Sequence, residues 1–77
     1  LGLPRSLYLG GASTVLSSLW PVEDRATAQF MEIFHQEARR EGDYGKAWLK
    51  ARDELRARGS PPWIYGAFVL GGGRSVN

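Results

Sequence analysis

The sequence contains no cysteine, one histidine and one methionine among its 77 residues. Without cysteine, these residues can form no disulfide bond, no thiolate metal site and no cysteine nucleophile. The single histidine, His35, excludes every zinc site that takes two histidine ligands from this chain. We therefore expect these residues to bind neither a metal ion nor any other cofactor.

Long apolar runs are absent as well. No run approaches the ~20 residues that a transmembrane helix needs, and no charged, apolar and small-residue succession at the start marks a signal peptide. We therefore expect a soluble, cytoplasmic protein that has no membrane partner. The only methionine is Met31, so we expect that the start was processed away or that these residues are a piece of a larger protein.

The composition is that of a folded protein. Hydrophobic residues make up 43% and charged residues 23% of the chain, and three tryptophans indicate a buried core. The net charge of +2 is a weak signal for nucleic-acid binding. The basic residues of segment 46–58 alternate with Asp53 and Glu54, which is typical of a solvated helix face. A small basic nucleic-acid binder is thus the least favoured class, and we expect no nucleic-acid partner.

Apolar spacing and chain breakers predict an α/β chain with the order helix, strand, helix, helix, strand. The expected ranges are about 3–9, 13–20, 25–41, 44–58 and 67–70, with a flexible tail over 72–77. Each of the two longer helices has one apolar stripe at helical spacing. The stripes are Thr27, Phe30, Met31, Phe34 and Ala38 in one helix, and Tyr44, Ala47, Trp48, Ala51 and Leu55 in the other.

The two predicted strands are too far apart in the sequence to form a hairpin. A long crossover favours parallel neighbours, and the first strand reads as buried on both faces. A sheet of two short strands is marginal alone, and a core this small rarely supplies more than ~3–5 kcal/mol. We infer that further strands lie in polypeptide outside these residues, and we predict that the isolated 77-residue chain is molten or aggregated.

Ser17 to Asp24, SSLWPVED, is the most distinctive stretch of the sequence. It places two hydroxyls, an aromatic ring and two carboxylates at the carboxyl end of a strand, where ligands bind on open α/β sheets. A purely structural interpretation is also open: Trp20 would lie in the core, Pro21 would turn the chain and Asp24 would cap the following helix. The two interpretations do not exclude each other.

The run from Gly10 to Ala28, GGASTVLSSLWPVEDRATA, resembles the signature of the CHAT domain, the "caspase HetF associated with TPRs" peptidase family. The resemblance covers nearly the whole chain, and its most specific part is Ser-Leu-Trp-Pro-Val followed by two acidic residues. Further similar residues follow in order: Phe30-Met31, Ile33-Phe34, Ala47 to Leu55, Trp63, and Ala67 to Gly71.

The resemblance implies a caspase-like fold, in which a mostly parallel sheet lies inside a three-layer α/β sandwich. Residues 1–77 would be the C-terminal part of such a domain. In this family a catalytic histidine and cysteine end strands that precede the similar region, so both are expected before Leu1. His35 does not match that histidine, and we expect it to be structural or exposed. These residues alone are therefore expected to be inactive.

For the similar region the resemblance implies substrate recognition. The strand at 13–20 would flank the pocket for the residue before the cleaved bond, and its edge could pair with an extended substrate. In separase-like relatives an acidic residue after Leu-Trp receives a basic substrate side chain. Asp24 stands in that register, with Glu23 in the place of a hydroxyl residue. The implied substrate-binding residues are Ser17, Ser18, Trp20, Glu23 and Asp24.

Other motifs predict no chemistry. Gly71-Gly72-Gly73 lacks the spacing and the lysine of a phosphate-binding loop, and a flexible exit is the better interpretation. Ser17 and Ser18 lie outside any G-x-S-x-G elbow, which argues against a serine hydrolase.

Two functions therefore remain open for the parent protein. One is a caspase-like cysteine endopeptidase, to which this chain contributes the substrate-pocket half. The other is a non-catalytic scaffold of the same family that binds an extended peptide or a protein. The expected partners are the remainder of the same domain, a peptide or protein substrate, and TPR or other repeat domains in the parent chain.

Overall fold

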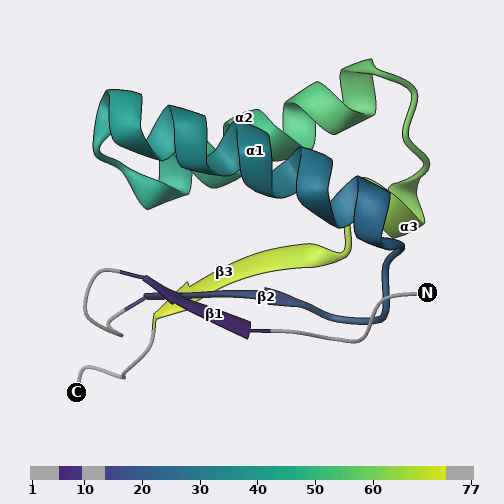
Figure 1. The fold of residues 1–77 in the computed structure, drawn as a ribbon, viewed down its shortest axis with the longest axis horizontal. Helices are drawn as coiled ribbons and strands as arrows, with labels where there is room; N and C mark the ends of the chain where they lie inside the picture. Colours follow the sequence, from purple (N-terminus) through teal and green to yellow (C-terminus); the bar gives the residue numbers. More distant parts are fainter. Residues whose placement is uncertain (1–5, 10–13, 73–77) are drawn as a thin grey trace.

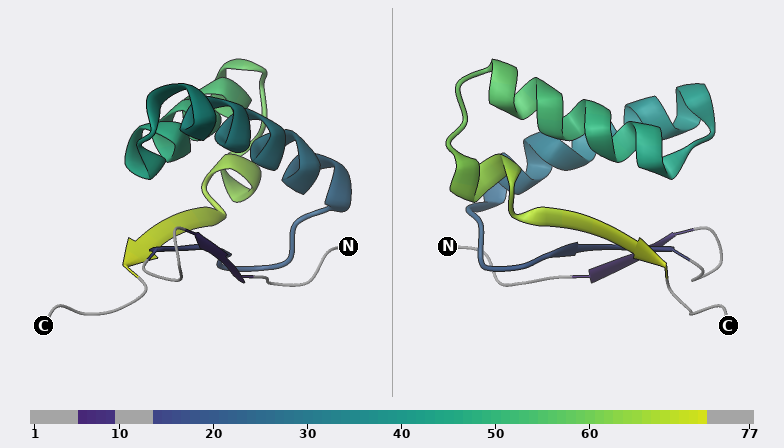
Figure 2. Two further views of the ribbon diagram at one scale, coloured as in Figure 1. Left: turned by 60° about the vertical axis from the view of Figure 1, so that its left-hand side comes forward. Right: turned by 180° about the vertical axis from the view of Figure 1, so that it is seen from behind.

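The computed structural model describes residues 6–9 and 14–72. Along the chain these residues form β1 (Ser6–Leu9), β2 (Thr14–Ser18), α1 (Asp24–Glu41), α2 (Tyr44–Ala57), α3 (Pro62–Tyr65) and β3 (Phe68–Gly72). The strands make one sheet in the order β1-β2-β3. Figure 1 shows α1 and α2 side by side on one face of this sheet. No helix of the described residues covers the opposite face, as the two views of Figure 2 show.

The two long helices form where their apolar stripes predicted them. α1 ends at Gly42, whose φ of 72° lies in the left-handed region and whose N–H donates to the carbonyl of Ala38 at 2.8 Å. The residue that precedes its first turn is Glu23, so the prediction of Asp24 as the N-cap is wrong by one position. α2 has a side-chain cap, because the carboxylate of Asp43 accepts the backbone N–H of Lys46 at 3.1 Å.

The core lies between the helix pair and the sheet. Phe30 of α1 stacks on Phe68 of β3 with ring centroids 4.1 Å apart, and both side chains are buried. Ala47 and Ala51 of α2 are fully buried in the same core. Leu16 is the buried residue of β2. The predicted stripes therefore pack together and onto the sheet.

The sheet is antiparallel where the sequence predicted parallel strands. β2 pairs with β3 from Thr14↔Gly72 to Ser18↔Phe68, and β1 pairs with β2 from Ser6↔Ser17 to Leu9↔Thr14, both in antiparallel register. The reason is visible in Figure 1: α1 leads away from the end of β2 and α2 leads back. A crossover of two helices returns the chain to the end of the sheet that it left, so β3 must run against β2. Within residues 6–9 and 14–72, helices cover β2 on one face only, not on both as the sequence predicted.

The first predicted helix, at about 3–9, is wrong for the residues that the structure describes there. Residues 6–9 form β1, in which Leu9 is buried and Leu7 is partly exposed. Backbone pairing with β2 satisfies the N–H and C=O groups of this short segment, and this tertiary contact overrides its weak helical pattern. The observed order is therefore strand, strand, helix, helix, short helix, strand.

The glycines at the end of the chain also differ from their prediction. Gly71 and Gly72 belong to β3 and lie opposite Val15 and Thr14 of β2. The predicted flexible tail over 72–77 therefore begins inside a strand, and its residues 73–77 lie outside the described residues.

Candidate functional site

The predicted site residues lie where β2 passes into α1. β2 ends at Ser18, α1 begins at Asp24, and residues 19–23 connect them. Val22 is buried, with 4% of its surface exposed, and it anchors this connection to the core. Its neighbours point outward, since Leu19 is 57% and Trp20 is 39% exposed. The connection thus buries one apolar side chain in the core and presents apolar surface at two other residues.

Trp20 is fixed by a hydrogen bond to a distant part of the chain. Its indole Nε1–H donates to the carbonyl oxygen of Trp63 in α3 at 2.8 Å. The backbone N–H of Leu19 donates to the carbonyl of Ala67, also at 2.8 Å. These two bonds tie the β2–α1 connection to the segment that leads from α3 into β3. The structural interpretation expected Trp20 in the core. Trp20 instead lies at the surface, where its indole N–H is hydrogen-bonded.

Ser17 and Ser18 lie on opposite faces of the sheet, because successive strand residues alternate. Ser18 shares the face of the buried Leu16, whereas Ser17 is on the face without helices. In the backbone register Ser17 lies opposite Val69, and Ser18 lies opposite Phe68. The sheet therefore separates the two hydroxyls, and they cannot line one pocket from the same face.

The strand that carries these serines has both of its edges occupied. β2 pairs with β1 on one side and with β3 on the other. The expectation that an extended substrate pairs with the edge of this strand is therefore wrong for the described sheet. Strand addition is open only to an outer strand of a sheet, which here means β1 or β3.

Glu23 and Asp24 place two exposed carboxylates at the start of α1. The backbone carbonyl of Glu23 accepts the N–H and the hydroxyl of Thr27, each at 3.1 Å, which fixes the first turn of the helix. Negative charge at this end is favoured by the helix dipole. The arrangement suits contact with a positively charged group that approaches from solvent.

His35, metal-binding groups and membrane-spanning helices remain to be considered. His35 is partly buried in α1, with its ring edge-on to Phe34 at a centroid distance of 5.5 Å. Within residues 6–9 and 14–72, no group of three or more His, Cys, Asp or Glu side chains is placed to hold a metal ion. None of the helices that the structure describes combines the length and the apolar character needed to cross a membrane.

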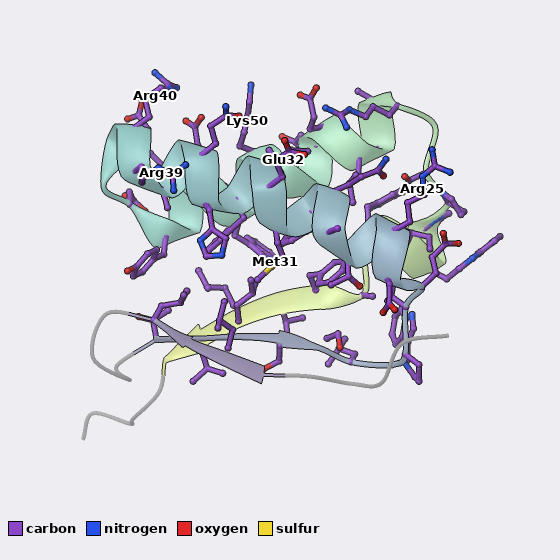
Figure 3. The ribbon with its side chains drawn as sticks, viewed as in Figure 1. Arg25, Met31, Glu32, Arg39, Arg40 and Lys50 are labelled. Carbon is purple, nitrogen blue, oxygen red and sulfur yellow. The ribbon has the colours of Figure 1, made fainter. Side chains whose placement is uncertain are left out.

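Charged side chains gather on the outer face of the helices. Figure 3 shows Glu32, Arg40 and Lys50 projecting away from the sheet, whereas Met31 lies between α1 and the strands. The carboxylate of Glu37 accepts a hydrogen bond from the guanidinium of Arg40 at 2.8 Å. This bond and the charge of Glu37, with the nearby charge of Glu41, raise the pKa of Arg40. Positive and negative groups are mixed on this face of α1. On α2, for which the sequence predicted such a mixed face, the guanidinium of Arg58 lies 3.6 Å from the carboxylate of Glu54.

The sequence did not indicate two tryptophan contacts. The backbone carbonyl of Trp63 accepts a hydrogen bond from the indole N–H of Trp20, while the side chain of Trp63 is 66% exposed. Trp48 of α2 donates its indole N–H to the carbonyl of Phe68 at 3.0 Å. Both acceptors are main-chain groups, which every residue carries, so no side-chain pattern could have indicated them. The run Gly59-Ser60-Pro61-Pro62, which precedes Trp63, indicated only that the preceding helix ends there.

The chain matches the sequence profile of the CHAT domain over residues 1–72. The chain belongs to the CHAT domain family. This match confirms the resemblance drawn from the Ser-Leu-Trp-Pro-Val motif, and it includes every residue of the candidate site. Membership of the CHAT family places the chain in a caspase-like peptidase family. No curated protein and no solved structure matches the chain.

Proposed function

We propose that this CHAT chain supplies part of the substrate pocket of a caspase-like cysteine endopeptidase. The observation that carries the proposal is the hydrogen bond from Trp20 to Trp63. It holds the most specific part of the family signature at the surface, directly before the exposed carboxylates of Glu23 and Asp24. A surface fixed in this way can read a substrate without rearranging, which lowers the entropic cost of binding.

The catalytic pair of the proposed enzyme comes from outside these residues, because the sequence has no cysteine. There, a thiolate would attack the scissile carbonyl carbon and a histidine would protonate the leaving amine. Water would then hydrolyse the resulting acyl-enzyme and return the thiolate. The 77 residues supply recognition only and have no peptidase activity alone.

The uncovered face of the sheet and its outer strand β1 support the same proposal. One face of the described sheet carries no helix (Figure 2), and β1 pairs with one described neighbour only. In the proposed domain, this chain is the C-terminal part. The preceding part adds parallel strands and a second layer of helices, which together complete a three-layer sandwich.

Within this pocket, Asp24 selects a basic substrate residue and Trp20 forms the adjacent wall. A carboxylate and a guanidinium form a charge-assisted hydrogen bond that can be bidentate. Glu23 adds a second negative charge beside it, and Ser17 or Ser18 contributes from the end of β2. Selection by charge requires a carboxylate at position 24, so the isosteric amide must weaken it.

The test is Asp24→Asn in the parent polypeptide, assayed on peptides that differ only in arginine or leucine before the cleaved bond. A hydrogen bond to a charged group contributes ~1.5–3 kcal/mol, so kcat/KM for the arginine peptide should fall roughly 10- to 100-fold. Cleavage of the leucine peptide should stay unchanged. Asp53→Asn, which removes an exposed carboxylate from α2, is the matched control. Equal cleavage of the arginine peptide by both variants would reject Asp24 as the selecting residue.

The alternative is a non-catalytic CHAT scaffold that binds an extended peptide or a protein with the same surface. The exposure of both Trp20 and Trp63 favours it, because tryptophan dominates many binding sites. One experiment distinguishes the peptidase from the scaffold. A parent polypeptide that binds a peptide but neither cleaves it nor reacts with an electrophilic thiol probe is a scaffold.

A further inference from the structure

The outer edge of β3 is a surface to which another strand could add. β3 pairs with β2 on one side, and no described strand pairs with its other side. The N–H of Leu19 donates to the carbonyl of Ala67, so that carbonyl points toward β2. Because carbonyl directions alternate along a strand, the carbonyl of the next residue, Phe68, points to the outer edge.

That outward carbonyl is already occupied by a side chain from α2. The indole Nε1–H of Trp48 donates to the oxygen of Phe68 at 3.0 Å. Trp48 is partly buried against the core, and the guanidinium of Arg52 lies over its ring, 4.8 Å from the ring centre. Arg52 follows Trp48 by one helical turn, so α2 supplies both the indole and the cation that covers it.

We propose that Trp48 closes the start of the β3 edge to strand addition by a second copy of this chain. A strand that adds there needs the carbonyl of Phe68 as an acceptor and the space beside it, and Trp48 takes both. Exposed edges are templates for aggregation, and covering them with another element is a common protection. This inference concerns self-association and does not depend on the proposed peptidase function.

The test replaces Trp48 with leucine in the natural polypeptide at its full length. Trp48→Leu keeps an apolar side chain on the core side of α2 but removes the indole donor and its bulk from the edge. Trp20→Leu is the matched control, because it removes an indole-to-carbonyl bond whose acceptor, Trp63, is not in a strand. Sedimentation equilibrium measures self-association of the variants and of the unchanged protein.

We expect the association constant of Trp48→Leu to rise up to about tenfold, since one freed backbone hydrogen bond contributes up to ~1.5 kcal/mol. Trp20→Leu should associate like the unchanged protein. Equal association of all three proteins, or equal gains in both variants, would overturn the proposal.

If Trp48→Leu fails to fold, NMR of the unchanged protein decides. The indole N–H of Trp48 must then exchange with solvent more slowly than that of Trp63, and equal rates would also overturn it.

Discussion

The indole nitrogen of Trp20 donates a 2.8 Å hydrogen bond to the carbonyl oxygen of Trp63, a residue 43 positions further along the chain. A second tryptophan, Trp48, donates to the carbonyl of Phe68. Both ends of segment 63–68 are therefore held by indole N–H groups, one from the β2–α1 connection and one from α2. This short segment links the candidate site to the edge strand of the sheet.

Replacing Trp20 with phenylalanine should loosen the candidate site without unfolding the domain. The ring keeps most of its apolar surface, but the bond to Trp63 is lost, at a cost of ~0.5–1.5 kcal/mol. Urea unfolding of the parent polypeptide measures this change. Trp63→Phe is the control, because its backbone acceptor remains. The interpretation fails if Trp63→Phe is destabilised as much as Trp20→Phe.

Gly66 closes α3, and a side chain there should disturb the same segment. A Cβ added at this position would lie 2.7 Å from the backbone oxygen of Pro62. Because a backbone atom cannot move aside cheaply, Gly66→Ala should destabilise the domain by ~1–3 kcal/mol. At Gly71 an added Cβ meets nothing within 4 Å, so Gly71→Ala should stay within ~0.5 kcal/mol of the unchanged protein. Thermal unfolding of the parent polypeptide with each substitution compares the two variants, and equal midpoints would contradict this account.

Phe30 is the centre of the core, since it is fully buried and stacks on Phe68. Phe30→Ala should cost ~3–5 kcal/mol, because it removes the contacts and leaves a cavity. Phe30→Leu retains much of the apolar volume and should cost ~1–2 kcal/mol. Chemical denaturation of the parent polypeptide, followed by circular dichroism, gives both values. Similar losses for the two variants would show that the stacked pair does not organise the core.

The isolated 77-residue chain should lack a cooperative thermal transition. The sheet of the described residues has one face without a helix (Figure 2) and two outer strands, and a core this small rarely supplies more than ~3–5 kcal/mol. Differential scanning calorimetry and near-ultraviolet circular dichroism test this expectation. A sharp transition in a monomeric sample, with strong aromatic signals, would show that the chain folds without further strands.

Local patterns in the sequence determined the helices and the motif. The stripes that contain Phe30 and Ala51 predicted α1 and α2 closely, because helical spacing and glycine stops act over one or two turns. The Ser-Leu-Trp-Pro-Val motif likewise indicated the family that the match over residues 1–72 confirms.

Only the tertiary structure decided how these parts combine. The direction of β3 follows from the return of α2, and residues 6–9 become a strand because β2 offers them a pairing edge. The position of Trp20 depends on the backbone carbonyl of Trp63. Such contacts join residues far apart in the sequence through main-chain groups that every residue shares, so no local pattern carries them.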